Sequence, residues 1–271
     1  MSDRHINKLS IFSILFLAMV AIYIFMGLRT VNAATVENKG NCSIYLNGEI
    51  DNFTADAIAK RYSQIKNCSG VGVTLYVNSN GGNVDTAIKA GDFIRQNRIR
   101  TFVDVNDSCA SACVLLFLGG VNRSPVGRMG LHRPYSLNLS SSELESRRSY
   151  ETINNQIRQY LIRMNIPDGI LNAMNAVPPN KIKWLQAKYV DDDDYKQLVS
   201  YHIIGSDPVF DDQRDSALAK RLGISKQEYY AREQRAESIC PDPLSDPSRG
   251  SLHERFEQYG KCHEDVLNGR R

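Results

Sequence analysis

The chain has 271 residues, a formal net charge of +3 and a hydrophobic residue content of 42%. A charge this close to neutral, with no basic stripe interleaved with aromatic residues, argues against a nucleic-acid-binding protein. Beyond its first segment, the chain is long enough for one domain of good size and a smaller appendage.

The first feature along the chain is an apolar run at residues 11–28 that carries almost no charge. As a helix, it would span the roughly 30 Å of hydrocarbon in a bilayer. Arg4 and Lys8 precede it, so the positive-inside tendency places the remainder of the chain outside the cytoplasm. Ala33 ends a segment that a signal peptidase could cut. Residues 1–34 are therefore predicted to be a signal peptide or a retained membrane anchor. Both predict a periplasmic protein or one anchored to the inner membrane facing the periplasm.

After this segment, strand and helix patterns alternate. They predict strands over 42–50, 72–78, 100–105 and 127–132. They predict helices over 54–66, 84–97, 111–120, 140–164, 168–175 and 180–188, the first of them with Thr54 as its N-cap. This alternation predicts an α/β domain at residues 35–204, with a sheet of mainly parallel strands covered by helices.

The composition changes after Ile204, where charged residues cluster and large apolar residues become rare. Residues 205–271 are predicted to form a small helical appendage. Its helices are expected over 217–236 and 253–268, with the proline-marked loop PDPLSDPSRG between them.

Six cysteines indicate an oxidising compartment, in which thiols at suitable separation pair. Six cysteines allow about 15 connectivities, so the sequence does not decide among them. Locality favours Cys42 with Cys68 and Cys240 with Cys262, while Cys109 and Cys113 bracket a serine. No CxxC or HxxxH spacing supports a zinc site, and no metal is expected.

Three features between Leu75 and Pro134 carry the chemistry. Gly81-Gly82 lets another part of the backbone approach closely. Ser111, between two alanines, has a hydroxyl with room around it, and His132 could act as a base. Taken singly, each has an ordinary structural interpretation: a turn that needs positive φ, a helix N-cap, and a histidine at the end of a strand. Their combination predicts a serine hydrolase.

The ordered motifs resemble the landmarks of the Clp protease proteolytic subunit and of the wider crotonase-like superfamily. They read YLNGEI, LYVNSNGG, CASA and GLHRP, at residues 45–50, 75–82, 109–112 and 130–134. The resemblance covers roughly residues 42–192. It implies a crotonase/ClpP-like ββα superhelix with helices flanking the sheet.

The resemblance implies a role for each matched position. Ser111 is the nucleophile and His132 the general base. Gly81 or Gly82, together with the backbone N–H of Ala112, forms the oxyanion hole. The family's aspartate, roughly fifty residues after its histidine, has no counterpart here, and Asn180 is the nearest candidate for the third triad member.

Asp191 to Asp194 would supply a carboxylate only under a different local alignment; otherwise they are a solvated loop, with no EF-hand spacing for calcium. A serine–lysine pair, known in signal peptide peptidases of the superfamily, fits poorly because Arg158 and Arg163 stand where a partner is sought. Lys181 and Lys183 come only much later. A cysteine nucleophile would need a free thiol in an oxidising compartment. No cofactor is expected, and a coenzyme A role does not fit outside the cytoplasm.

Two functions follow. The first is an extracytoplasmic serine peptidase-like hydrolase that cleaves peptides or unfolded protein segments through a Ser-His dyad or a Ser-His-Asn/Asp triad. It would work without ATP and without an ATPase partner, and the chain carries no Walker motif. Because residues 140–164 fall where the Clp subunit has its ring-to-ring handle, a homo-oligomer is also expected. The alternative is an inactive crotonase-like scaffold that binds a protein partner at the membrane or in the periplasm.

Overall fold

The computed structural model describes residues 33–66, 68, 72–135, 142–188, 192–243 and 245–271. The apolar run at 11–28, predicted to be a signal or membrane helix, lies outside these residues. Among the helices in the described part of the chain, none combines the length and the apolar character needed to cross a bilayer.

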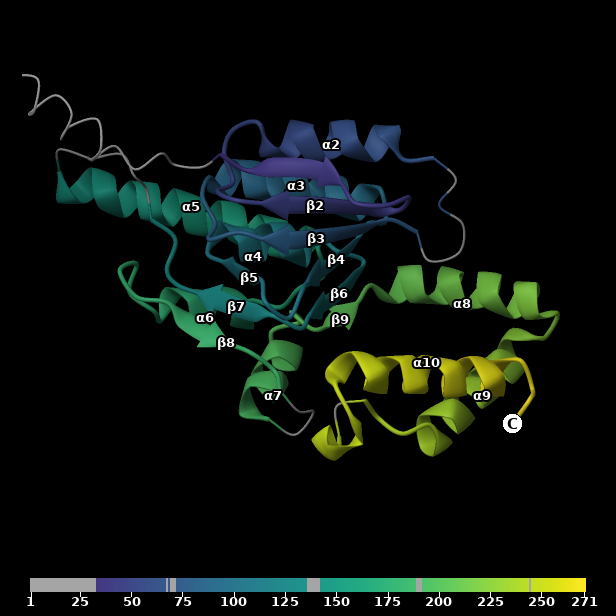
Figure 1. Ribbon diagram of the computed structural model, residues 1–271. Coiled ribbons are helices and arrows are strands. Elements are labelled where there is room, and N and C mark those ends of the chain that lie inside the picture. Colours follow the sequence, from purple (N-terminus) through teal and green to yellow (C-terminus); the bar gives the residue numbers. More distant parts are fainter. Residues whose placement is uncertain (1–32, 67, 69–71, 136–141, 189–191, 244) are drawn as a thin grey trace, which may run out of the picture. The chain divides into compact units, whose positions relative to one another are not determined.

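The main sheet has six strands in the order β1-β2-β3-β4-β6-β9. They are β1 (Thr35–Asn38), β2 (Ser43–Asn47), β3 (Thr74–Asn78), β4 (Arg100–Val103), β6 (Asn122–Pro125) and β9 (Gly205–Ser206). The four central strands pair in parallel, while β1 and β9 add antiparallel edges. The mixed α/β fold with a mainly parallel sheet is therefore confirmed (Figure 1).

Helices pack around this sheet: α2 (Thr54–Gln64), α3 (Val84–Gln96), α4 (Ala112–Leu118), α5 (Glu143–Arg163), α6 (Gly169–Asn175) and α7 (Asp193–Ser200). Every residue of α4 is buried, so this short helix lies in the core, as its small and apolar sequence predicts. Tyr160 of α5, also buried, donates a hydrogen bond to the carbonyl of Leu115 in α4 at 2.7 Å. Both sides of α4 are thus packed.

A second sheet of three strands stands beside α4. It contains β5 (Ser108–Ala110), β7 (Arg128–Leu131) and β8 (Lys183–Leu185), in the order β5-β7-β8. The helix predicted over 180–188 is therefore wrong, because residues 183–185 form a strand antiparallel to β7. A short apolar run does not by itself distinguish helix from strand, and here the free edge of β7 supplies backbone partners that favour the strand.

The N-cap predicted for α2 is also wrong by one residue. Phe53 holds the cap position without a side-chain hydrogen bond, and Thr54 is the first helical residue. The Thr54 hydroxyl accepts from Asp51 N–H at 3.0 Å and donates to the Asp51 carboxylate at 2.8 Å. The threonine closes the turn that leads into the helix rather than capping it.

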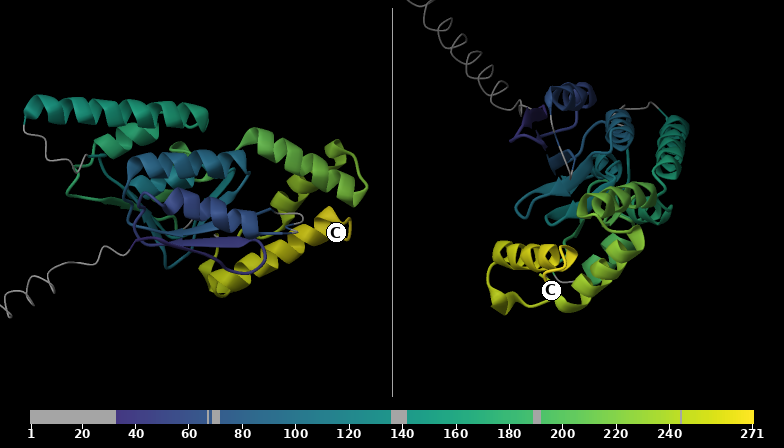
Figure 2. Two further views of the ribbon diagram at one scale, coloured as in Figure 1. Left: turned by 90° about the horizontal axis from the view of Figure 1, so that it is seen from above. Right: turned by 90° about the vertical axis from the view of Figure 1, so that its right-hand side faces the viewer.

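Residues beyond β9 are helical: α8 (Pro208–Leu222), α9 (Lys226–Ile239), the 3₁₀ turn η1 (Pro247–Arg249) and α10 (Leu252–Leu267). The single helix predicted over 217–236 is wrong, because Gly223 ends α8 in the left-handed conformation (φ 70°) and Ser225 caps α9. The Cys240–Cys262 disulfide joins α9 to α10, as predicted, and the two helices lie side by side (Figure 2).

This helical region has a small core of its own, built from Ala236, Cys240, Cys262 and Val266 with Tyr259 packed against it. Its connection to the main sheet runs through β9 and through an ion pair between Arg95 and Asp207 at 2.6 Å. The same Arg95 guanidinium donates to carbonyl oxygens at the C-terminal end of α4, those of Leu118, Gly119 and Gly120. The division at residue 204 stays a prediction.

Candidate active site

Ser111 lies in the turn between β5 and α4, with φ 58° and ψ −128°. For a residue with a Cβ, this backbone conformation is sparsely populated and costs roughly 1–3 kcal/mol. Its N–H donates to the carbonyl of Gly130 on β7 at 2.9 Å, and its own carbonyl accepts from Val114 N–H at 3.0 Å. Ser111 occupies the N-cap position of α4, yet its hydroxyl makes no capping hydrogen bond. A strained serine on a strand-to-helix turn is the arrangement of a nucleophile elbow.

Gly81 packs directly against this turn. A Cβ at Gly81 would lie 2.6 Å from the Cβ of Ser111 and 3.0 Å from the backbone nitrogen of Ala112. Its φ of 103° also belongs to the region that residues with side chains rarely adopt. Glycine is therefore required here both by backbone conformation and by space. The structure brings Gly81, Ser111 and Ala112 together, as the oxyanion-hole prediction requires.

The two glycines differ in how their N–H groups are used. The N–H of Gly81 donates to the hydroxyl of Ser79 at 3.1 Å. Gly82 forms an isolated parallel β-bridge with Ile50. In this bridge Ile50 N–H donates to the carbonyl of Gly81, and Asn83 N–H donates to the carbonyl of Ile50, each at 2.8 Å. This bridge does not use the N–H of Gly82. Of the two predicted donors, the N–H of Gly82 is thus the one for which the described residues show no acceptor within the protein.

His132 follows the last residue of β7. Because β5 and β7 pair in parallel with Ala110 opposite Gly130, both strands end at the same end of the small sheet, where Ser111 follows β5 and His132 follows β7. A contact between the Ser111 hydroxyl and the His132 ring stays a prediction. His132 is 7% exposed.

One hydrogen bond orients the His132 ring. Its Nδ1 lies 3.0 Å from the carbonyl oxygen of Arg133. Because a carbonyl oxygen only accepts, Nδ1 carries the proton in this bond, which leaves the lone pair on Nε2. This is the tautomer that a general base needs. The ring of Tyr135 packs beside it, with centroids 6.0 Å apart.

Asn180, predicted to orient His132, lies exposed in the turn before β8. The antiparallel register of β7 and β8 pairs Leu131 with Lys183, so Asn180 comes before the paired residues. The bond described for His132 Nδ1 goes to Arg133 instead. A contact between Asn180 and His132 stays a prediction.

The aspartates farther on have structural partners. The Asp192 side chain caps α7 by accepting from Asp194 N–H at 2.9 Å, and the Asp194 side chain accepts from Gln186 N–H at 3.0 Å. Asp193 lies 3.7 Å from Lys196. Asp191 lies outside the described residues. These carboxylates lie at the N-cap and in the first turn of α7, where negative charge stabilises a helix, and this accounts for the acidic run at this point of the chain.

The structure also bears on the alternative nucleophile schemes, the serine–lysine pair and the cysteine nucleophile. Arg158 and Arg163 form ion pairs with Asp168 and Asp92, at 3.2 and 2.8 Å. All six cysteines form disulfides, so the thiol scheme has no free thiol. Across the described part of the chain, no group of three or more His, Cys, Asp or Glu side chains could hold a metal ion.

The loop before β5 is tied to the main sheet. Tyr45 of β2 donates its phenol proton to the carboxylate of Asp107, whose own carbonyl accepts from Arg128 N–H at 3.1 Å. Burial, and then the hydrogen bond to this carboxylate, raises the pKa of Tyr45 well above its ordinary value. A neutral tyrosine thus links the central sheet to the loop before β5, the strand that precedes Ser111.

Three features of the site were missed from the sequence. The first is Ser79, which is 3% exposed and whose hydroxyl fixes the glycine turn; its place two residues before Gly81 is the signal for such a turn. The second is the carbonyl of Arg133, which no sequence pattern reveals. The third is the pairing of Cys109 with Cys113, which spans Ser111.

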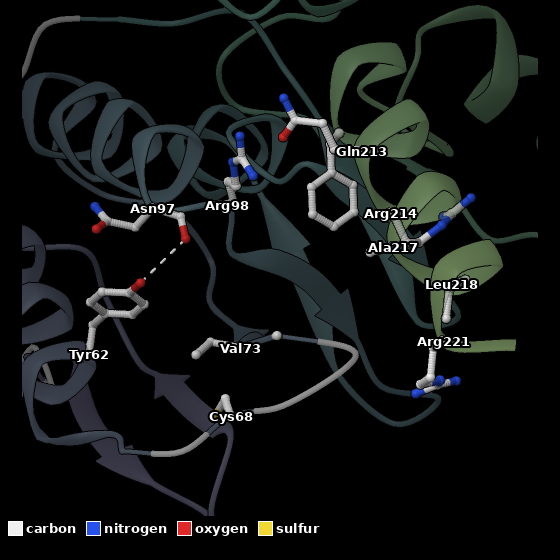
Figure 3. A pocket seen from close by; sticks show the side chains of 12 residues that line it. Tyr62, Cys68, Val73, Asn97, Arg98, Gln213, Arg214, Ala217, Leu218 and Arg221 are labelled. Carbon is white, nitrogen blue, oxygen red and sulfur yellow. Dashed lines mark hydrogen bonds between the residues drawn. The ribbon is translucent and has the colours of Figure 1, made fainter. Parts of the chain in front are cut away.

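A cavity of about 680 Å³ lies elsewhere, between the end of α3 and α8 (Figure 3). Tyr62 and Val73 line one side and Leu218 the other, and Tyr62 donates a hydrogen bond to the carbonyl of Asn97 at 3.5 Å. None of the predicted catalytic residues lines it. Its shape therefore adds nothing to the site at Ser111.

Comparison with known proteins gives one family match and a distant structural likeness. Residues 33–165 match the family model described as Clp protease. A solved structure similar to the chain is a mutant of ClpP1 from Listeria monocytogenes, at 18% identity and a TM-score of 0.42, covering 62% of this chain and 94% of that one. A likeness this distant assigns no residue roles. The search of curated proteins gave no match.

Residues 33–165 are thus similar in sequence to Clp proteases.

Proposed function

We propose that this protein is a serine peptidase that cleaves peptides or unfolded protein segments, with Ser111 as nucleophile and His132 as general base. The observation that carries the proposal is the backbone of Ser111, held at φ 58° against Gly81 while its hydroxyl remains unused for capping. Strain of this kind persists only where the surrounding structure holds it, and it clusters at active sites. The neighbouring strand β7 is followed directly by the buried His132, whose Nδ1 donates to the Arg133 carbonyl, which is the tautomer of a base.

In this mechanism, Nε2 of His132 takes the proton of the Ser111 hydroxyl as the oxygen attacks the scissile carbonyl. The negative charge that develops on the carbonyl oxygen is held by the N–H groups of Gly82 and Ala112. Removal of one such donor typically costs about 3–4 kcal/mol of transition-state stabilisation. The imidazolium then returns the proton to the leaving amine, and water releases the acyl group from Ser111 by the reverse sequence.

The group that orients His132 distinguishes this site from a complete triad. The carbonyl of Arg133 accepts from Nδ1, whereas Asn180 is the side chain that the sequence offers for the same task. A neutral carbonyl fixes the tautomer but stabilises the imidazolium less than a carboxylate would. We expect a Ser-His dyad, with slower turnover than a Ser-His-Asp triad.

We also place this activity outside the cytoplasm. Three disulfides support that location, because such bonds persist in oxidising compartments and are rare in cytosolic proteins. The periplasm holds essentially no ATP, so the peptidase would work without an unfoldase. Self-association fits α5, whose Leu144 and Ile162 are 57% and 61% exposed.

Hydrolysis of a permanently unfolded protein tests the proposal. The full chain, produced in an oxidising compartment, should cleave a reduced and alkylated protein without ATP, and ATP should not change the rate. Ser111→Ala should remove the cleavage while its melting temperature stays within a few degrees of wild type. Asn180→Ala should cleave within about threefold of the wild-type rate if the Arg133 carbonyl orients His132. Cleavage that survives in Ser111→Ala would refute the assignment.

A further inference from the structure

The Cys109–Cys113 disulfide encloses Ser111. The two cysteines are four residues apart, with Cα atoms 5.3 Å from each other, and both are fully buried. Cys109 lies in β5 and Cys113 in the first turn of α4, so the bond joins the strand before the serine to the helix after it. The other two disulfides, Cys42–Cys68 and Cys240–Cys262, do not involve β5 or α4.

The turn at Ser111 needs such a link because its ordinary supports are incomplete. The strand side is held by Ala110 N–H to Ser79 O and by Ser111 N–H to Gly130 O, both at 2.9 Å. The helix side begins with no side-chain cap, so it lacks the stabilisation that such a cap gives a helix start. A capping bond here would use the Ser111 hydroxyl, the group that the proposed chemistry needs free.

Relaxation of the turn would move the nucleophile. Ser111 at φ 58° would lose its backbone strain if it escaped to an ordinary conformation, and α4 is too short to oppose this by its own hydrogen bonds. A covalent link between residues on either side of Ser111 removes most of the alternatives. It fixes the first turn of α4 without using the hydroxyl.

We propose that the Cys109–Cys113 disulfide is a positioning element that holds Ser111 in its reactive backbone conformation. This inference rests on the proposed function, since it assigns the bond a part in the reactivity of the same serine. It gives this disulfide a different role from the other two, which join segments more than twenty residues apart, with sequence separations of 26 and 22.

The test compares the rate at which a small fluorophosphonate labels the oxidised full chain. Cys109→Ala/Cys113→Ala removes the positioning disulfide, and Cys42→Ala/Cys68→Ala is the matched control that removes a distant one. Labelling is followed well below the lowest melting temperature. The rate constant at saturating reagent is measured separately from the fraction of protein labelled at the end point.

A positioning role predicts that Cys109→Ala/Cys113→Ala labels at least tenfold more slowly at saturating reagent, while most of the protein is still labelled at the end point. A merely structural role would instead lower the labelled fraction and leave the rate constant of the folded molecules unchanged. The control variant should keep a rate within twofold of wild type, even where its melting temperature falls. Equal rates for Cys109→Ala/Cys113→Ala and wild type would overturn the inference while leaving the peptidase proposal standing.

A second variant, Cys109→Val/Cys113→Ala, refills part of the core volume lost from β5. It guards against a double alanine variant that does not fold, and slow labelling is expected of it as well. A wild-type rate in this variant would overturn the inference. Wild-type protein that is folded and oxidised but never labelled would instead defeat the proposed function, and the positioning role with it.

Discussion

The turn at Ser111 and the C-terminal helices differ in whether a side chain hydrogen-bonds the free backbone N–H groups at the start of the helix. In the C-terminal region, Asp207, Ser225 and Ser251 each cap a helix with a side-chain hydrogen bond, and Ser251 does so in a capping box with Glu254. At α4 the N-cap is Ser111, which has positive φ and no capping bond. Phe53 of α2 and Asp168 of α6 also lack a side-chain cap, but among the described helix N-caps only Ser111 combines that lack with positive φ.

The largest expected effect is that of His132→Gln. Glutamine cannot take the proton from Ser111, so fluorophosphonate labelling should slow by about 10³-fold or more. The melting temperature should change little, because glutamine can still donate to the carbonyl of Arg133. Stopped reactions resolved by gel fluorescence would measure the rate, and a loss below tenfold would show that His132 is not the base.

Gly81→Ala sharpens the comparison between the two regions. The added Cβ would lie 2.6 Å from the Cβ of Ser111, so the turn must shift. We expect a loss of labelling by about 10²-fold or more and a stability loss of about 2–4 kcal/mol in urea unfolding.

Gly223→Ala is its matched control in the C-terminal region. That glycine also has positive φ, at 70°, but an added Cβ meets nothing within 4 Å. The cost should be about 1 kcal/mol, from backbone strain alone, with the labelling rate unchanged. Similar effects of the two substitutions on labelling would remove the special status of Gly81.

Removal of the Cys240–Cys262 disulfide should affect stability alone. Cys240→Ala/Cys262→Ala opens a link with a sequence separation of 22 inside the small core of α9 and α10, and should cost about 2–4 kcal/mol of the stability of that region. Hydrogen exchange would locate the loss in α9 and α10. Labelling of Ser111 should stay within twofold of wild type, and a larger decrease would couple the two regions.

The smallest effect concerns alkaline pH. Burial raises the pKa of Tyr160 far above its ordinary value of 10.0, so the folded protein keeps this phenol protonated while the unfolded chain releases its proton. Stability from this group is therefore present below pH 10 and is lost as the pH rises above it. Urea unfolding from pH 8 to 11 should show a shallower decline in Tyr160→Phe. At pH 8 that variant should be about 1 kcal/mol less stable, for loss of the bond to Leu115. An equal slope in both proteins would contradict the assignment.

Much of the main domain followed from its hydrophobic periodicity. The strands near Leu75 and Phe102, the helices near Ile88 and Leu115, and the local disulfides were predictable because each depends on neighbours in the sequence. The break at Gly223 was also readable, since glycine followed by serine marks the end of one helix and the start of the next.

Other features depended on contacts between distant segments. Lys183 to Leu185 form a strand because β7 offers a free edge more than fifty residues earlier in the chain. The bond that orients His132 comes from a backbone carbonyl, which has no sequence signature. The Cys109–Cys113 pairing required the turn geometry at Ser111, where a strand meets a helix within one residue. Sequence patterns report local preference, and these features are set by tertiary structure.

Mapping the fluorophosphonate adduct tests the central claim most directly. The oxidised full chain would be labelled, digested and examined by tandem mass spectrometry, with Ser111→Ala treated in parallel. The account predicts a single phosphonylated residue, Ser111, and no adduct in the variant. An adduct on another residue, or equal labelling of the variant, would contradict the assignment of Ser111 as the nucleophile.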